Sequence, residues 1–107
     1  MAIDLQGRLA ALGIQLPAYT PPTASYEPWI EISGQLLLSG HVSILPGIEH
    51  RGRLGETLSL DEGKRAAQVC AMGLLSRMNA ALRGSWDGFD RLVRLNVFVA
   101  SASDFSL

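Results

Sequence analysis

The strongest hydrophobic periodicity in the chain runs over residues 60–83, where apolar side chains recur every three or four positions. That spacing predicts an amphipathic helix. Ser59 and Glu62 form an S-x-x-E capping box at its start, and Arg83 in the last turn followed by Gly84 predicts its end. The predicted buried face consists of Ala67, Cys70, Ala71, Leu74, Met78, Ala81 and Leu82. The predicted polar side consists of Lys64, Arg65, Gln68, Arg77, Asn79 and Arg83.

A shorter helix is predicted over residues 4–12, where leucines recur at i, i+4 and i+7. Asp4 can cap its start, and Gly13 occupies the position that favours a left-handed residue at the end. Residues 1–16 are therefore expected to form an N-terminal helix and turn. Residues 17–28 hold four prolines without periodicity and predict an extended arm.

Strand patterns begin after this arm. Residues 29–32 and 35–39 flank Ser33-Gly34, and a two-residue connection containing glycine predicts a tight hairpin. The run Leu36-Leu37-Leu38 is apolar without alternation, so we expect the second strand to be covered on both faces.

The second strand is predicted to continue past Gly40 through residues 41–44 until Pro46 ends it. Glycine inside such a run predicts a bulge or a close backbone approach. The glycine-rich, charged stretch that follows, up to Thr57, predicts an exposed loop. Residues 91–100 alternate between two faces and predict a further strand.

This order of elements predicts an α+β fold in one small domain over residues 1–107, with its core in residues 29–107. Residues 101–105 have the composition of a helix start, and only two residues follow them. We therefore expect the core to be incomplete at its C-terminus. A sheet this small has exposed edges, which either a second subunit or a longer chain would cover.

Composition and charge narrow the class of protein. Nine Lys and Arg residues oppose ten Asp and Glu residues, giving a net charge of −1, which argues against a protein that coats nucleic acid. The lone cysteine, Cys70, cannot form an internal disulfide, and no signal peptide or membrane-spanning run is visible. A soluble cytoplasmic protein is the expectation.

Few residue patterns point to chemistry. His41, His50 and Cys70 lack the spacing of metal ligands, so no metal is expected. Cys70 lies on the predicted apolar face of the helix, where a thiol usually packs rather than reacts. Asp61 and Glu62 are interpreted as helix-start residues rather than as an acid/base pair, and no phosphate-binding loop is present.

Two polar residues on predicted strands are open to two interpretations each. Arg94 shares a face with Asn96 and Phe98, where its guanidinium could hold a carboxylate. Alternatively, this face lies in water or against a partner subunit. Ser39 places a hydroxyl at the end of an apolar strand, beside Gly40. That hydroxyl either bonds to its own sheet or points into a pocket.

The order and spacing of four motifs resemble the Rid family, the reactive intermediate deaminases, also called the YjgF family. The similarity extends from about Tyr26 to Leu107. Its motifs are Ser39-Gly40-His41 after an apolar strand, Gly52-Arg53-Leu54-Gly55, the helix start Leu58–Gly63, and Val93–Val99 followed by Asp104-Phe105. The resemblance implies a chorismate-mutase-like α+β fold, homotrimers, and ligand clefts between subunits.

The resemblance also implies an activity without a cofactor, the hydrolysis of reactive enamines and imines to 2-keto acids and ammonia. Tyr26 matches the family's cleft-lining aromatic residue, and Ser39 matches the serine of its Ser-Gly-Gln element, in which His41 here replaces glutamine. The family's carboxylate-binding arginine lies in a strand beyond residue 107. An asparagine early in the family's second helix and a glutamate that helps to position water also lie beyond residue 107. The chain is therefore expected to be a C-terminally short member with unassigned catalytic residues.

Three functions follow as hypotheses. The first is imine or enamine deamination at subunit interfaces, with Ser39, Tyr26 and Arg94 as candidate substrate-binding residues for an imino, enamine or keto acid. The second is a noncatalytic trimeric domain that binds a metabolite or a protein. The third is RNA cleavage or inhibition of translation, as described for some family members. The net charge of −1 disfavours this third hypothesis, and neither a nucleic-acid nor a membrane partner is expected.

Overall fold

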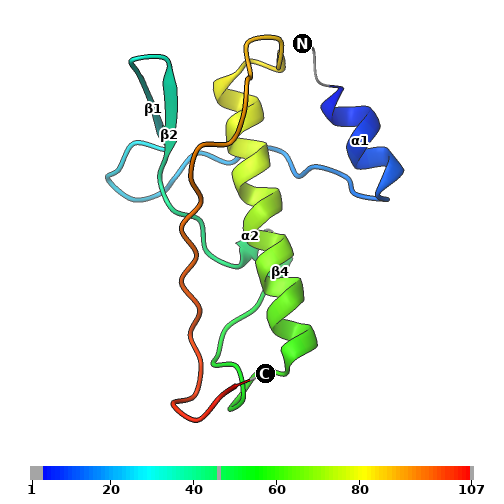
Figure 1. Cartoon of the computed structure of the whole chain (residues 1–107), viewed down its shortest axis with the longest axis vertical. Helices are drawn as coiled ribbons and strands as arrows, with labels where there is room; N and C mark the ends of the chain where they lie inside the picture. The colour runs from blue at the N-terminus through cyan, green and yellow to red at the C-terminus, as the bar shows by residue number, and fades with distance from the viewer. Residues whose placement is uncertain (1–3, 46, 107) are drawn as a thin grey trace. The chain divides into compact units, whose positions relative to one another are not determined.

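The computed structural model describes residues 4–45 and 47–106, and within them it has an α+β fold, which confirms the predicted class (Figure 1). Pro46, which was expected to end the second strand, lies outside the described residues, as do residues 1–3 and 107. The elements in chain order are α1 (Leu5–Ala11), β1 (Trp29–Ile32), β2 (Gln35–Leu38), β3 (Ile44–Leu45), β4 (Ile48–Glu49) and α2 (Leu60–Ala81). No helix among the described residues is both long and apolar enough to cross a membrane.

The chain divides into two compact units. The first comprises residues 4–41 and 72–91, and the second comprises residues 42–71 and 92–106. Helix α2 contributes its C-terminal part to the first unit and its N-terminal part to the second. The expectation of one domain over residues 1–107 stays a prediction.

Local capping chemistry defines α1 as predicted. The Asp4 carboxylate accepts a hydrogen bond from the Gly7 N–H at 3.0 Å. At the other end Gly13 has φ 71°. The Ile14 N–H donates to the Leu9 carbonyl at 2.9 Å. These are the features of a Schellman motif, and they satisfy carbonyl groups that the helix leaves unpaired. On the predicted apolar face Leu9 is buried, whereas Leu12 is exposed.

The hairpin β1–β2 also forms as predicted. Trp29 lies opposite Leu38. Ser33 and Gly34 both have positive φ, as a type I′ turn requires. The prediction that β2 is covered on both faces is wrong, because Leu37 is 49% exposed. The strand ends at Leu38 instead of continuing to residue 44, since the next two carbonyls, Ser39 and Gly40, accept hydrogen bonds from an α2 side chain.

The predicted capping box at the start of α2 is present. The Ser59 N–H donates to Glu62 Oε1 at 3.0 Å, and the Glu62 N–H donates to Ser59 Oγ at 3.2 Å. The Ser59 backbone and hydroxyl bonds lower the pKa of the Glu62 carboxyl, with smaller help from Arg65 and His50. This stabilisation is present above the ordinary pKa of glutamate and is lost as the pH falls through the lowered value.

The end of α2 differs from the prediction by one position. Arg83, rather than Gly84, is the first left-handed residue after the helix, with φ 54°. The Gly84 N–H donates to the Asn79 carbonyl at 3.0 Å, and the Arg83 N–H donates to the Ala80 carbonyl at 3.1 Å. The helix therefore closes with a Schellman motif that places a residue with a Cβ atom in the conformation that favours glycine.

Replacing Arg83 with glycine is expected to raise the free energy of unfolding by about 1 kcal/mol, because it removes the strain of a left-handed Cβ. Urea denaturation followed by circular dichroism measures the change. The matched control is Gly84→Ala, which introduces a Cβ at φ 79° and should lower stability. An Arg83→Gly variant that is no more stable than the parent chain would contradict the assignment.

The buried face of α2 is not the predicted one. Ala67 and Ala71 are exposed, whereas Arg77, which was expected on the polar side, is buried. The buried residues of the helix are Val69, Gly73, Ser76 and Arg77. In the first unit this buried stripe includes Gly73 and Ser76, whose small size lets other parts of the chain approach the helix closely. For example, the Ser76 hydroxyl donates to the Pro17 carbonyl at 2.8 Å.

The second unit contains a hairpin that the sequence pattern missed. Strands β3 and β4 pair antiparallel, with Leu45 opposite Ile48. β3 lies at the end of the predicted second strand, whereas β4 lies inside the stretch expected to be a loop. The dipeptide Pro-Gly between them is a turn signal that could have indicated it. Leu54 makes two backbone hydrogen bonds to residues near the end of the chain. Its N–H donates to the Ala100 carbonyl at 3.0 Å, and its carbonyl accepts from the Ala102 N–H at 2.9 Å.

The strand predicted over residues 91–100 is not formed. All ten residues are exposed, and none belongs to a strand in the part of the chain that the structure describes. Figure 1 draws this segment as an extended tube. The alternating pattern is compatible with a sheet, but a strand also needs a neighbour that is hydrogen-bonded along its length. Among the described residues, only Leu54 is shown bonding to this segment, at Ala100.

Candidate functional site

An open hollow of about 500 Å³ lies beside the hairpin β1–β2 in the first unit. Its volume is within the range of about 300–1,000 Å³ typical of small-molecule sites. The residues that line it are Glu27, Trp29, Ile30, Leu37, Leu38 and Ser39. Four of these six side chains are apolar, so the hollow has apolar walls and a polar end formed by Glu27 and Ser39.

Ser39 directly follows the last residue of β2, and its role in binding a substrate stays a prediction. Its hydroxyl donates to the Glu27 carbonyl, and the residue also lines the hollow. Its N–H donates to the Pro28 carbonyl at 3.1 Å, which extends the pairing of the hairpin by one bond. Ser39 is half-buried. The structure thus brings a predicted site residue to the polar end of a hollow, with its backbone held by the preceding arm.

Arg77 binds the carbonyl group of Ser39, a contact that the sequence pattern did not predict. Its guanidinium Nη1 donates to the Ser39 carbonyl at 2.7 Å and lies 3.3 Å from the Gly40 carbonyl oxygen. Arg77 is only 6% exposed. Its buried Nε has no hydrogen-bond partner within the described chain. A buried cation therefore contacts carbonyl oxygens directly after β2.

Gly73 lies one helical turn before Arg77, and His41, the residue after Gly40, packs against it. A Cβ atom at Gly73 would lie 2.2 Å from His41 Nε2, so the imidazole packs against the helix backbone. The predicted close backbone approach is therefore at Gly73 and not at Gly40, where a Cβ would meet nothing within 4 Å. Glycine in a helix interior is unfavourable without such a reason, and this is the signal that could have located the contact.

The other two predicted site residues are placed differently. Tyr26 is 46% exposed and does not line the hollow, although its neighbour Glu27 does. Arg94 is exposed and belongs to the second unit. Their substrate-binding roles stay predictions.

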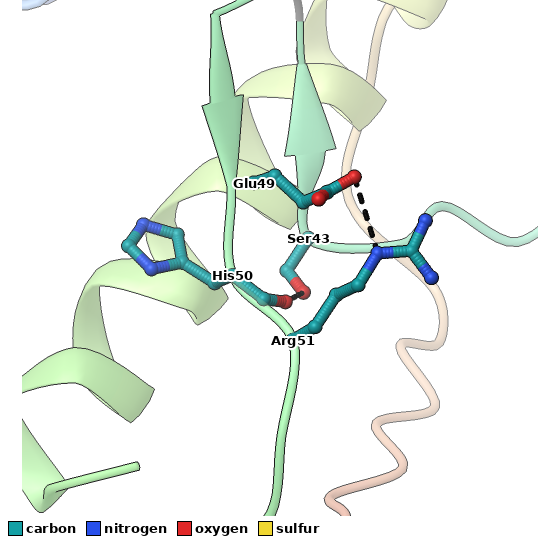
Figure 2. A network of polar contacts seen from close by, with 4 residues as sticks. All are labelled: Ser43, Glu49, His50 and Arg51. Carbon is teal, nitrogen blue, oxygen red and sulfur yellow. Dashed lines mark hydrogen bonds and ion pairs between the residues drawn. The ribbon is translucent and has the colours of Figure 1, made fainter. Parts of the chain in front are cut away.

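A separate polar cluster surrounds the hairpin β3–β4 in the second unit (Figure 2). The Ser43 hydroxyl donates to the His50 carbonyl at 2.7 Å, and the His50 N–H donates to the Ser43 carbonyl at 3.1 Å. Arg51 Nε lies 3.1 Å from Glu49 Oε1, and both side chains are exposed. Figure 2 shows the His50 imidazole directed away from that ion pair. An exposed ion pair contributes little to stability. We therefore interpret the cluster by its Ser43–His50 hydrogen bonds, which hold the hairpin together.

The remaining titratable candidates do not form a centre. Burial raises the pKa of the half-buried Cys70 thiol, which lowers the fraction of reactive thiolate. Within residues 4–45 and 47–106, no group of three or more His, Cys, Asp or Glu residues is arranged to hold a metal ion.

Comparisons with known proteins give the family. No family model matches the chain. It is 40% identical over 114 residues to Protein TCP17 of Trypanosoma cruzi, in an alignment that covers 99% of this chain and 69% of that protein. The chain belongs to the family of Protein TCP17.

Two crystal structures are similar to this fold. Atu1372 of Agrobacterium tumefaciens, a protein of unknown function, is 36% identical over 94% of this chain, with a TM-score of 0.80. The structure of "a putative endoribonuclease" from Shewanella oneidensis is 28% identical over 71% of this chain, with a TM-score of 0.65. The matched regions cover 61% and 51% of those two chains, respectively.

Proposed function

We propose that this chain is a Rid-type domain whose hollow beside Ser39 binds a small metabolite derived from an amino acid. In an assembly of copies it promotes hydrolysis of reactive enamines and imines to 2-keto acids and ammonia. The observation that carries the proposal is the position of Ser39, the residue that matches the family's ligand-site serine, at the polar end of an apolar hollow. The similar fold of the Atu1372 and Shewanella structures supports it at the level of architecture.

The apolar part of the lining fits the side chain of this substrate class. The apolar walls from Trp29, Ile30 and Leu37 suit the short alkyl side chain of a 2-imino acid. An enamine first takes up a proton at carbon and loses one from nitrogen to become the imine. Water then adds across the C=N bond to form a carbinolamine, which collapses to the ketone and releases ammonia. The Ser39 hydroxyl is placed to orient the imine or the water beside it.

The substrate carboxylate requires a cation, and none lines the described hollow. In the proposed homotrimer a neighbouring copy supplies it, and Arg94 is the candidate because it is exposed on an extended segment. A guanidinium can bind a carboxylate through two parallel hydrogen bonds. The carboxylate-binding part of the site is therefore expected to exist only in the assembly.

The surface of the second unit supports association of copies. Six large apolar side chains are exposed within residues 92–99. They are Leu92, Val93, Leu95, Val97, Phe98 and Val99. Large apolar side chains exposed in such number are typical of interaction sites, and an extended segment readily adds to another sheet.

A noncatalytic metabolite-binding domain is the second candidate. It is favoured by one observation: Glu27 is the only acidic or basic side chain among the residues that line the described hollow. RNA cleavage, which the description of the Shewanella protein raises, is disfavoured by the net charge of −1.

A coupled assay separates these functions. A dehydratase generates 2-aminoacrylate from serine, and semicarbazide traps the imine as an absorbing semicarbazone. The chain is expected to slow semicarbazone formation, and Ser39→Val should lower this activity about tenfold. Ser85→Ala, an exposed serine away from the hollow, is the matched control. No turnover with retained binding of 2-oxobutanoate would favour the binding domain, and loss of both would refute the proposal.

A further inference from the structure

Arg77 is an unusual buried residue. A cation that is 6% exposed is normally paired with a carboxylate, because removal of a charge from water is unfavourable. No ion pair involving Arg77 is found among the described residues, and the partners of its Nη1 are the carbonyl oxygens of Ser39 and Gly40. Its Nε remains buried without a partner in the same part of the chain. An apolar side chain would fill the space without this penalty, so stability alone does not explain an arginine here.

The two carbonyls that Arg77 contacts follow β2 directly, at the polar end of the hollow. The Ser39 peptide is held from two sides, since its N–H donates to Pro28 at 3.1 Å and its carbonyl accepts from Arg77 at 2.7 Å. With the backbone held in this way, the Ser39 hydroxyl reaches the Glu27 carbonyl beside the hollow. The position of the hydroxyl therefore depends on a side chain that does not line the hollow itself.

A lysine cannot reproduce this arrangement. The guanidinium is planar and presents several N–H groups in fixed directions, whereas the ammonium of lysine is a compact charge on a flexible stem. One Nη1 group is shared between oxygens at 2.7 and 3.3 Å, which constrains two successive peptides at once. The next residue, His41, is held in turn against Gly73.

We propose that Arg77 is a positioning residue that sets the Ser39 hydroxyl at the hollow and thereby determines ligand affinity. The part of this inference that concerns affinity rests on the proposed function, because it takes the hollow to be the ligand site. The part that concerns Ser39 and Gly40 stands on the geometry of the first unit alone.

The test combines two variants with two readouts. Arg77→Lys keeps the charge, Arg77→Met keeps much of the volume, and Arg65→Lys changes an exposed arginine of the same helix as the control. NMR follows the amide and carbonyl resonances of Ser39 and Gly40, and titration with 2-oxobutanoate measures affinity. Both Arg77 variants are expected to shift these resonances and weaken binding about tenfold, while Arg65→Lys changes neither.

The unaltered chain provides a readout that does not depend on variants folding. Restricted rotation should give separate Nη resonances for Arg77 and one averaged resonance for Arg65. An averaged Arg77 signal, or folded Arg77 variants with unchanged Ser39 and Gly40 resonances, would overturn the positioning role. If the unaltered chain does not bind 2-oxobutanoate while those resonances shift as expected, the proposed function fails and the positioning of Ser39 by Arg77 stands. If the probe binds equally to all variants, the effect on affinity is refuted.

Discussion

Replacing Gly73 with alanine is expected to lower the free energy of unfolding by about 1–3 kcal/mol, the typical cost of overpacking. The same exchange inside a helix ordinarily stabilises it by about 0.5–1 kcal/mol. The sign reverses here because the new Cβ would lie 2.2 Å from His41 Nε2 and 2.3 Å from its Cε1. The imidazole or the helix must move to make room for the new methyl group.

A double-mutant cycle isolates this contact. In a His41→Ala background the clash is gone, so Gly73→Ala is expected to become stabilising. Gly88→Ala is the control, since a Cβ there would meet nothing within 4 Å. Urea denaturation measures all four chains and the control. Equal destabilisation by Gly73→Ala with and without the imidazole would show that His41 does not pack on this glycine.

Replacing Phe98 with aspartate is expected to dissociate the proposed assembly of copies. Phe98 is 95% exposed, and its neighbours Val97 and Val99 are exposed as well. If this surface is buried between copies, an unpaired carboxylate in it is unfavourable by about 3–5 kcal/mol, which corresponds to a loss of affinity of roughly a hundredfold or more.

Size-exclusion chromatography with light scattering measures the outcome. The parent chain is expected to run as a trimer and Phe98→Asp as a monomer. Ser103→Asp adds the same charge at an exposed position outside the apolar run and should leave the trimer intact. A parent chain that stays monomeric at all concentrations, or a Phe98→Asp variant that associates equally well, would contradict the assignment of residues 92–99 as the interface.

Features controlled by neighbouring residues in the chain were predictable. Asp4 and Gly13 define α1, Ser33-Gly34 forms the turn of the first hairpin, and Ser59 caps α2. Each of these depends on hydrogen bonds or backbone conformations within a few residues. The sequence pattern therefore located α1, α2 and the first turn to within one or two residues.

Features that depend on distant partners were not predictable. The alternation in residues 91–100 indicates which side chains share a face, but it does not say whether a neighbouring strand is present. The periodicity of α2 allowed more than one buried stripe, and the packing of Pro17 and His41 selects the side that carries Gly73 and Arg77. An arginine is counted as polar in such a pattern, although its long side chain can be buried.

The candidate site likewise contains one residue that the sequence predicted and one that it did not. Ser39 could be predicted from a hydroxyl at the end of an apolar strand and from its place in a motif. Arg77 could not, because its partners are backbone carbonyls 37 and 38 positions away in the chain. Tyr26 and Arg94 need the assembled protein for their test.

The most direct test of the account is a map of ligand binding by NMR. Titration of the chain with 2-oxobutanoate is expected to give saturable shifts at Trp29, Leu37 and Ser39, the residues that line the hollow. Leu37→Glu should abolish these shifts, and Ser39→Val should weaken binding about tenfold. Saturable shifts confined to residues outside the hollow, or no saturable shifts at all, would contradict the claim that the hollow beside Ser39 is the ligand site.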